Sequence, residues 1–447
     1  MEFSKIKEIL VEEAKRLGVT EYDIYFSKSE SVSAETLKQE ISSFSSSNGI
    51  GVSFRCVRDG KFGYASSELI TPDEVRGLVA KAYENALYIE SDDEAIIFRG
   101  SEYYEKVENP VLPDVSMADL KKIAMDIQKT TYATSEYVVD GTQSGVGMAR
   151  ETVDMYNSYG LELHDEVNAY QYLVMVAVTK DGESEQEFEY RYETSFDKAT
   201  EIAKPVVDEA LSKIGAGQVA SGSYDLVLSG KMMATMLATF SGAFSAKSAQ
   251  LGLSQFAGKE GSTVAADFIT VTDDPFSDKM LCKNAFDAEG VATSRKNVIE
   301  NGVLNTLLYD LATAKKAGKE TTANASRGSY AAPTAISPYF LYINEGSKTL
   351  DELLASAENG IYITELKGLH AGANPVTGDF SLESAGYRIE NGKLAGAVKT
   401  FTIAGNFYEL LKNIDSLSNK VELARPGIGR GYGSPAALWK NASVAGK

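Results

Sequence analysis

The sequence predicts an α+β fold in two domains, and three features lead to this prediction. An N-terminal α/β-mixed domain with helices packed on a sheet is expected over residues 1–218, because helical periodicity alternates there with strand-like apolar runs. Small residues replace this periodicity at 215–223, which marks a linker. After it, short apolar runs separated by Gly, Asn, Asp and Pro predict a C-terminal, mainly-β barrel-like or sandwich domain over residues 219–447.

Three helices are predicted in the first part of the N-terminal domain. Residues 4–17 place their apolar side chains on one helical face, and Gly18 is a typical helix stop. Thr71 can begin a second helix by accepting a hydrogen bond from the amide of Glu74, whose carboxylate can reach back to the cap. A third helix is expected to begin near Ser116.

The strand-like runs of this domain lie at 23–26, 49–57 and 170–178. The run at 170–178 is almost continuously apolar, which indicates a central strand covered on both faces. The acidic and aromatic segment at 181–193 is typical of a solvated edge strand. A helix over about 197–214 ends the domain, and Pro205 is expected to kink or divide it.

The second domain is expected to begin with a short strand at 224–229, followed by one Ala-rich helix over 231–250. Residues 297–318 predict a strand, an Asn-Gly hairpin turn, a second strand and a helix. The Asn391-Gly392 pair predicts a second hairpin of the same kind. Repeated short strands with such turns indicate the β-rich body.

The bulk composition argues against several functional classes. Lys and Arg total 44 against 63 for Asp and Glu, so the net charge of −19 repels phosphate and direct nucleic-acid binding is not expected. The longest uncharged stretch, 232–246, is too short to span a bilayer, and the N-terminal segment lacks the apolar core of a secretion signal. Cys56 and Cys282 are expected to be buried thiols in a reducing compartment. These features favour a cytoplasmic protein without a membrane anchor.

The chain contains only two histidines, His164 and His370, and they are 206 residues apart. No histidine pair therefore has the spacing of a zinc helix, and His164 is expected at the edge of a strand. A Ser-His-Asp site needs a poised serine, but Pro435 removes the amide that would follow Ser434 into an oxyanion hole. The glycine-rich run at 427–433 lacks the Lys-Ser or Lys-Thr pair of a phosphate loop and is expected to be a turn.

The stretch LHAGANPVTGDF, residues 369–380, holds the candidate site residues of this chain. His370 could act as a general base or line a substrate, and Asp379 could orient it. Asn374 and Asp379 are also turn formers that can satisfy nearby backbone amides. A structural loop and a binding element both remain open on residue chemistry alone.

Five segments give a resemblance to a known family: 49–66, 155–163, 284–318, 368–411 and 432–447. The block GLHAGANPVTGDFSLESAGYRIENGKLAGAVKTFTIAGNFYELL, residues 368–411, resembles the C-terminal signature of the TldD/PmbA family, once labelled modulators of DNA gyrase. The resemblance spans nearly the whole chain. It implies a cytosolic metallopeptidase in which two related subunits pair.

In that family, TldD-type subunits carry an H-E-x-x-x-H zinc helix and a later cysteine ligand, whereas PmbA-type subunits, also called TldE, lack them. The segment MLATFSGAFSAKSAQ, residues 236–250, has neither His nor Glu, and Ile428 stands about where the cysteine is expected. The chain therefore resembles the PmbA/TldE side. The resemblance implies no metal ligand or cofactor in this chain, zinc in a TldD-type partner, and peptides or unfolded segments as substrate.

Two other functions remain open at this point. The chain could be an autonomous hydrolase that uses His370 as general base, or a non-enzymatic peptide-binding or regulatory protein. Its partner could be a TldD-type subunit, a second copy of itself in a homodimer, or both. The sequence predicts neither the stoichiometry nor the natural substrate.

Overall fold

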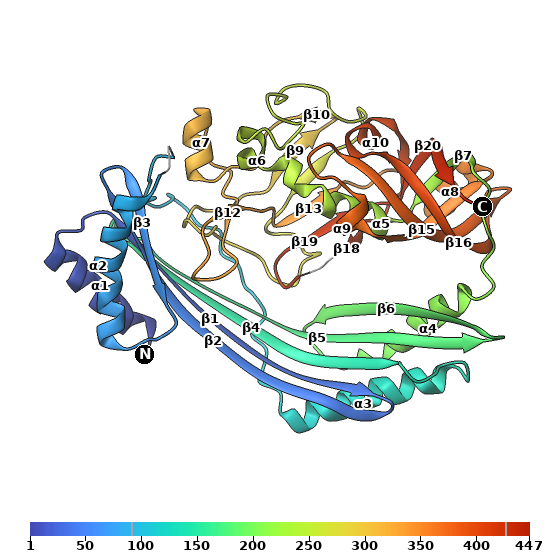
Figure 1. Ribbon diagram of the computed structural model, residues 1–447, viewed down its shortest axis with the longest axis horizontal. Helices are drawn as coiled ribbons and strands as arrows, with labels where there is room; N and C mark the ends of the chain where they lie inside the picture. Colours follow the sequence, from blue (N-terminus) through green and yellow to red (C-terminus); the bar gives the residue numbers. More distant parts are fainter. Residues whose placement is uncertain (91–92, 425–426) are drawn as a thin grey trace.

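A computed structural model describes residues 1–90, 93–424 and 427–447. A long curved sheet forms the N-terminal part, and a β-rich body lies over its concave side (Figure 1). The sheet is six-stranded and antiparallel, in the order β3-β2-β1-β4-β5-β6. Its strands are β1 (Tyr22–Leu37), β2 (Glu40–Arg58), β3 (Lys61–Ser67), β4 (Gln143–Asn157), β5 (Glu162–Lys180) and β6 (Glu183–Glu193).

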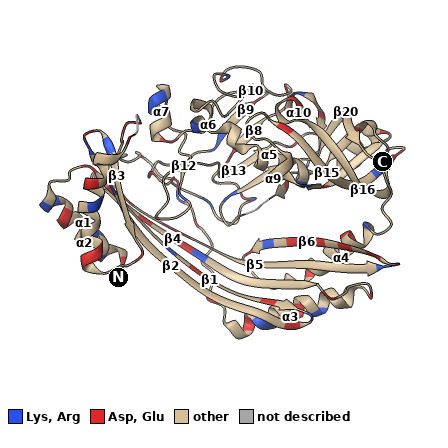
Figure 2. Cartoon of the chain, viewed as in Figure 1, with Lys and Arg blue, Asp and Glu red and all other residues tan. Residues whose placement is uncertain are grey.

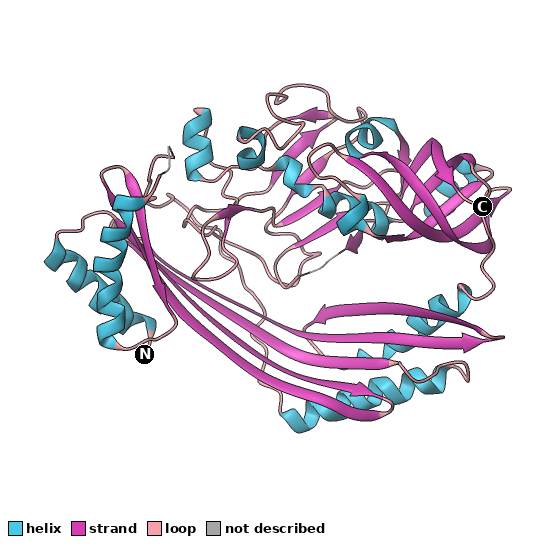
Figure 3. Cartoon of the chain, in the orientation of Figure 1, coloured by secondary structure: helices cyan, strands magenta, loops and turns pink. Residues whose placement is uncertain are grey.

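Helices cover this sheet at its two ends, as Figure 3 shows. At one end α1 (Phe3–Leu17) and α2 (Pro72–Asn85) share a core with β1–β3, and at the other α3 (Met117–Thr134) and α4 (Ala203–Ser212) share a core with β4 and β5. The helix stop at Gly18 and the caps at Thr71 and Ser116 are confirmed. Glu74 does not complete the expected reciprocal cap; its carboxylate accepts a hydrogen bond from Lys81 at 2.6 Å.

Two predictions about the end of this domain need correction. Strand β5 lies between β4 and β6, so its central position is confirmed. Its residues alternate between buried and half-buried over 170–176 and are all buried at 176–178, so the prediction that both faces are fully covered is wrong for most of the run. The predicted edge strand is confirmed as β6, but four of its five acidic side chains pair with lysines. The helix at Pro205 is divided as expected, into a 3-10 turn at Ala199–Ile202 and α4.

The C-terminal part contains a closed five-stranded barrel, so the barrel alternative of the sequence prediction is confirmed. The ring runs β16-β15-β14-β7-β20 and closes through pairing of β16 with β20. The barrel and its attached strand consist of β7 (Gly222–Leu228), β14 (Gly360–Lys367), β15 (Asp379–Glu390), β16 (Lys393–Asn406), β20 (Ala437–Ala445) and β17 (Ile414–Leu417). Residues 213–221 connect α4 to β7, and the predicted linker falls in this connection.

A second sheet of six short strands packs beside the barrel, in the order β10-β9-β8-β13-β19-β18. Its strands are β8 (Val271–Asp273), β9 (Lys296–Glu300), β10 (Val303–Leu304), β13 (Phe340–Ile343), β18 (Glu422–Ala424) and β19 (Gly431–Ser434). The remaining short elements are η1 (Ala86–Tyr88), α7 (Leu311–Ala317), α8 (Leu350–Ala357), α9 (Leu369–Gly372), α10 (Phe407–Asn413), β11 (Ala325–Ser326) and β12 (Ala335–Ile336). Both Asn-Gly hairpins are confirmed, between β9 and β10 and between β15 and β16.

The single Ala-rich helix predicted over 231–250 is wrong. The chain forms α5 (Gly230–Thr239), a 3-10 turn at Ser241–Phe244 and the short α6 (Ala246–Gln250). Ser245 is extended and caps α6 by accepting from the amide of Ser248, which stops a continuous helix. The break lets Phe240 and Phe244 both point into the core of the C-terminal part.

The two cysteines are buried and free, as predicted. Burial raises the pKa of the Cys56 thiol to about 12 and that of Cys282 to about 11, so neither is a reactive thiolate near neutral pH. Within the described ranges, no helix combines the length and the apolar character needed to cross a membrane.

Candidate functional site

The loop that carries the candidate residues connects β14 to β15 and contains the one-turn helix α9. His370, Asn374 and Asp379 are all exposed on it. The Asn374 side-chain oxygen accepts from the amides of Val376 and Thr377 at 3.0 and 3.2 Å, which folds the turn.

The carboxylate of Asp379 is held by the barrel rather than by the histidine. Its Oδ1 accepts a hydrogen bond from Asn406 Nδ2 at 2.9 Å, and this bond lowers the pKa of the carboxyl. Asn406 also caps α10 by accepting from the amides of Tyr408 and Glu409. Asn374 and Asp379 therefore hold the loop against the barrel, while His370 stands exposed on α9.

Residues 236–250, in which the resemblance places the zinc helix, form the end of α5, the 3-10 turn and α6. The inner face of α5 is filled by Met and Leu side chains. Toward β6 this helix presents Lys231 and Thr235. The Lys231 ammonium donates to Glu189 at 3.1 Å, and the Thr235 hydroxyl donates to the Lys231 carbonyl at 2.7 Å. Neither side chain is a zinc donor of the usual kind.

Over 1–90, 93–424 and 427–447, no group of three or more His, Cys, Asp or Glu side chains is placed to hold a metal ion. His164 is paired with Asp154 at 2.8 Å on the surface of the β4–β5 hairpin, far along the chain from α5. The donor set of the described residues therefore does not fit the zinc ion that the family implies. No catalytic step through a metal is derived for this chain.

Several cavities lie where the sheet meets the β-rich body, and two of them adjoin the segments in which the family places its metal ligands. The edge-strand cavity, about 360 Å³, is bounded by β6 residues such as Tyr190 and Tyr192 and by Thr235, Met280 and Leu423. Its walls are aromatic and aliphatic with polar groups between them, a lining typical of ligand pockets.

The sheet-face cavity, about 440 Å³, is lined by Tyr25, Asp165, Asp287, Ile428 and Arg430, among others. Asp287 is buried, and burial raises the pKa of its carboxyl to about 6. Its two oxygens accept from the backbone amides of Glu289, Val291 and Ala325, so this carboxylate organises the loop. Ile428 presents no donor where the family places a cysteine.

Sequence analysis missed a buried group of charges between the two parts of the chain. Arg55 donates to Asp23 at 2.5 and 2.9 Å across β1 and β2, and its Nη1 lies 4.0 Å from Glu289 of the C-terminal part. Arg327 lies 3.9 Å from Asp23 and over the ring of Tyr25. The signal in the sequence was an arginine inside the apolar run GIGVSFRCV, since a charge in a buried strand needs a partner.

Two family models match segments of this chain. The PmbA/TldA metallopeptidase C-terminal domain matches residues 221–446, and PmbA/TldA metallopeptidase domain 1 matches residues 22–86. An uncharacterized protein of Methanocaldococcus jannaschii is 30% identical over 91% of this chain and 94% of its own. The metalloprotease PmbA of Escherichia coli O157:H7 is 22% identical over 90% of this chain and 88% of its own.

Solved structures share the whole fold. A Thermotoga maritima protein described as a candidate modulator of a DNA gyrase superposes with a TM-score of 0.89 at 29% identity, covering 99% of this chain and 100% of its own. TldE from Thermococcus kodakarensis superposes with a TM-score of 0.87 at 23% identity, covering 98% and 99%. The fold and the matched domains define a protein of a metallopeptidase class. The chain belongs to the PmbA/TldD family.

Proposed function

We propose that this chain is the metal-free, PmbA/TldE-type subunit of a cytoplasmic two-component metallopeptidase that cleaves peptides or unfolded segments. The observation that carries the proposal is the make-up of residues 236–250, which contain no His, Cys, Asp or Glu although the chain belongs to the PmbA/TldD family. A TldD-type partner would supply the zinc ion, which activates water for attack on the peptide bond. Relatives named as PmbA metalloproteases support the peptidase role.

The geometry also supports a role in holding the substrate. β6 is the last strand of its sheet and borders the edge-strand cavity. An extended peptide can pair with the backbone of such an edge, a mode of recognition that makes little demand on sequence. The aromatic side chains of Tyr190 and Tyr192 offer apolar contacts beside that edge.

The test uses the purified chain, a TldD-type relative expressed alone, and the two expressed together. We expect no stoichiometric zinc and no cleavage from this chain alone, and faster cleavage of an unfolded model protein by the mixture than by the relative alone. A chelator should stop the activity of the mixture.

Hydrolysis by the chain alone that survives the chelator and disappears in His370→Ala would replace this proposal with the autonomous hydrolase. Saturable binding of unfolded peptides without cleavage, even in the mixture, would replace it with a non-enzymatic binding protein. The same samples give the stoichiometry by light scattering, which separates a homodimer from a heteromeric assembly.

A further inference from the structure

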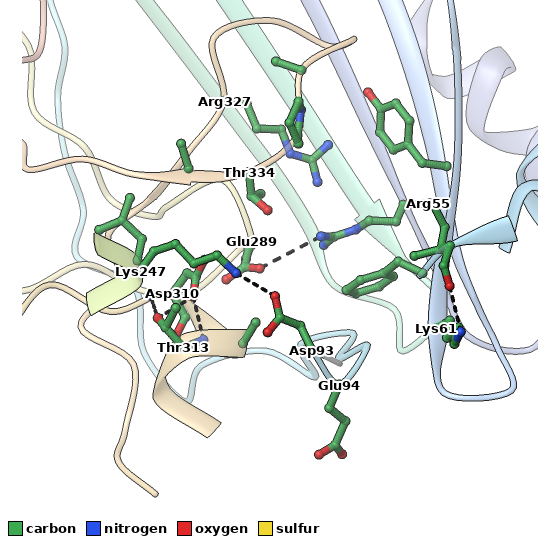
Figure 4. A pocket seen from close by; sticks show the side chains of 18 of the residues that line it. Arg55, Lys61, Asp93, Glu94, Lys247, Glu289, Asp310, Thr313, Arg327 and Thr334 are labelled. Atoms are coloured by element: carbon green, nitrogen blue, oxygen red, sulfur yellow. Dashed lines mark hydrogen bonds and ion pairs between the residues drawn. The ribbon is translucent and has the colours of Figure 1, made fainter. Parts of the chain in front are cut away.

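A third cavity, about 370 Å³, lies between the N-terminal sheet and the loop 328–336; we call it the arginine cavity. The residues that line it include Arg55, Glu289, Arg327 and Ala332. Figure 4 shows Arg55, Arg327 and Glu289 converging on this space from different segments of the chain. The volume lies in the range of small-molecule sites, about 300–1,000 Å³.

The two arginines of this cavity differ in how well they are neutralised. Arg55 makes two hydrogen bonds to Asp23. Arg327, whose side chain is 1% exposed, lies 3.9 Å from Asp23, and its Nη1 donates to Ser53 at a long 3.4 Å. The Nε of Arg327 is buried and has no hydrogen-bond partner among the described residues. A buried guanidinium donor without an acceptor is costly unless a ligand supplies one.

The buried charge is also out of balance. Glu289 is the second carboxyl near the arginines, but burial raises the pKa of Glu289 to about 8, with Arg55 opposing the shift. The raised pKa favours the neutral form of Glu289, so Asp23 is the ionised carboxylate nearest to the two buried guanidiniums. Lys247 and Asp93 pair with each other at 2.7 Å at the rim and leave this balance unchanged. A ligand that brings one negative charge would balance the second guanidinium.

The Nε and Nη2 atoms of an arginine can hold a carboxylate with two parallel hydrogen bonds. Apolar side chains form part of the cavity wall, among them Phe62, Ile89, Pro333 and Ile336. Charged side chains of both signs also line it, namely Lys61, Lys247, Asp93, Glu94 and Asp310. We propose that the arginine cavity binds a short peptide by its free C-terminal carboxylate, with Arg327 as the principal contact. The peptide identity rests on the proposed function, because each cleavage leaves a new carboxylate end.

The test measures binding to the purified full chain by isothermal titration calorimetry. The probes are N-acetyl-Ala-Ala with a free carboxylate, the same dipeptide as its C-terminal amide, and inorganic phosphate. The free acid should bind with 1:1 stoichiometry and the amide about tenfold or more weakly, because the charged hydrogen bonds are lost. Equal affinity of acid and amide, no binding of the acid, or tighter binding of phosphate would overturn the proposal.

Two variants locate the site independently. Arg327→Met removes the guanidinium and should abolish binding of the acid. That change could also unfold the contact between the two parts of the chain, so a second variant is needed. Ala332→Trp fills the cavity from a half-exposed loop and should abolish binding of the acid while both arginines stay in place. Ala371→Trp, at an exposed position of α9, is the matched control and should bind as the unmodified chain does. Retained binding in Ala332→Trp would overturn the assignment.

The result of this binding test can be told apart from the result of the test of the proposed function. If the dipeptide does not bind but the chain still speeds up cleavage by a TldD-type relative, only the carboxylate-site inference is wrong. Specific dipeptide binding without any stimulation of cleavage removes the subunit proposal and leaves the carboxylate site in place.

Discussion

Asn374 and His370 lie four residues apart on the same exposed loop, yet they differ in what they contact. Asn374→Ala removes the acceptor of two backbone amides, so we expect it to lower the free energy of unfolding by about 1 kcal/mol. His370→Ala, at an exposed position, should change it by less than about 0.5 kcal/mol. Urea unfolding of both variants measures the difference, and a larger loss in His370→Ala would contradict this account of the loop.

Glu289 gives a prediction about pH. Its pKa is raised from an ordinary glutamate value to about 8 in the folded chain, first by burial. Between these two values the folded state keeps a proton that the unfolded state has released, so the carboxyl makes the folded state less stable as the pH rises. In Glu289→Gln this contribution is absent, and the glutamine can still accept from the amide of Leu311, which now bonds Glu289 at 2.9 Å.

The measurement is the free energy of unfolding of both proteins from about pH 5 to about pH 8. The unmodified chain should lose at least about 1 kcal/mol relative to Glu289→Gln across that window, given about 1.4 kcal/mol for each unit of pKa shift. Parallel curves for the two proteins would show that Glu289 is ionised in the folded state.

At the scale of single elements, the β9–β10 hairpin depends on Gly302 for two reasons. Its φ is +79°, and a Cβ added there would lie 2.6 Å from the Ala265 carbonyl oxygen. Gly18 at the end of α1 has a φ of +72° but open space around it. Gly18→Ala should therefore lower the free energy of unfolding by about 1–2 kcal/mol, and Gly302→Ala should lower it by at least about 1 kcal/mol more. Thermal or urea unfolding measures both losses. Equal losses would mean that the backbone near 265 moves aside.

Local chemistry determines which elements were predictable. The Asn-Gly turns and the caps at Thr71 and Ser116 act within four residues, so the sequence alone predicted them. The break after α5 contains Ser241-Gly242, a pair that marks turns, and Ser245 then caps α6; the sequence prediction overlooked both signals. The core, which buries both Phe240 and Phe244, also favours the broken form.

Strands β1 and β2 were predicted far too short for a related reason. The outer half of β2 is serine-rich, polar and exposed, and no apolar alternation marks it. The outer half of β1 is largely polar in sequence although Ala34 and Thr36 are buried there. Pairing with β4 and with each other sets their length instead. Arg55 stands in an apolar run and so signals a buried charge, but the sequence does not reveal the group it belongs to, because Glu289 and Arg327 lie hundreds of residues from β1 and β2.

At the scale of the whole molecule, lysines join β6 to the β-rich body. Figure 2 shows acidic residues along β6, and these meet Lys231 and Lys399 of the C-terminal part. Lys213 bonds both Glu187 of β6 and Glu365 of β14. Burial lowers the pKa of Lys213, but the hydrogen bond and charge of Glu187 outweigh it, so the pKa is raised.

Removing the two lysines of the body should loosen β6 without unfolding the chain. These pairs are partly exposed, so Lys231→Met with Lys399→Met should cost less than about 2 kcal/mol in total. Hydrogen exchange of the amides at 183–193 should become faster, and about 1 M salt should have the same effect on the unmodified chain. Lys204→Met, which removes an exposed pair within α4, is the control. Unchanged exchange at 183–193 in the double variant would contradict the prediction.

The closure of the barrel by β20 also constrains how the protein is made. β20 pairs with β7 at one side and with β16 at the other, so Gly222 meets Val444 and Thr402 meets Ala445. A growing polypeptide leaves the ribosome from its N-terminal side, at about 5–20 residues per second. The ring thus stays open for the time needed to synthesise roughly the last two hundred residues after β7. During that interval the edge of β7 that β20 later covers keeps unpaired backbone groups, and such an edge can pair with another chain.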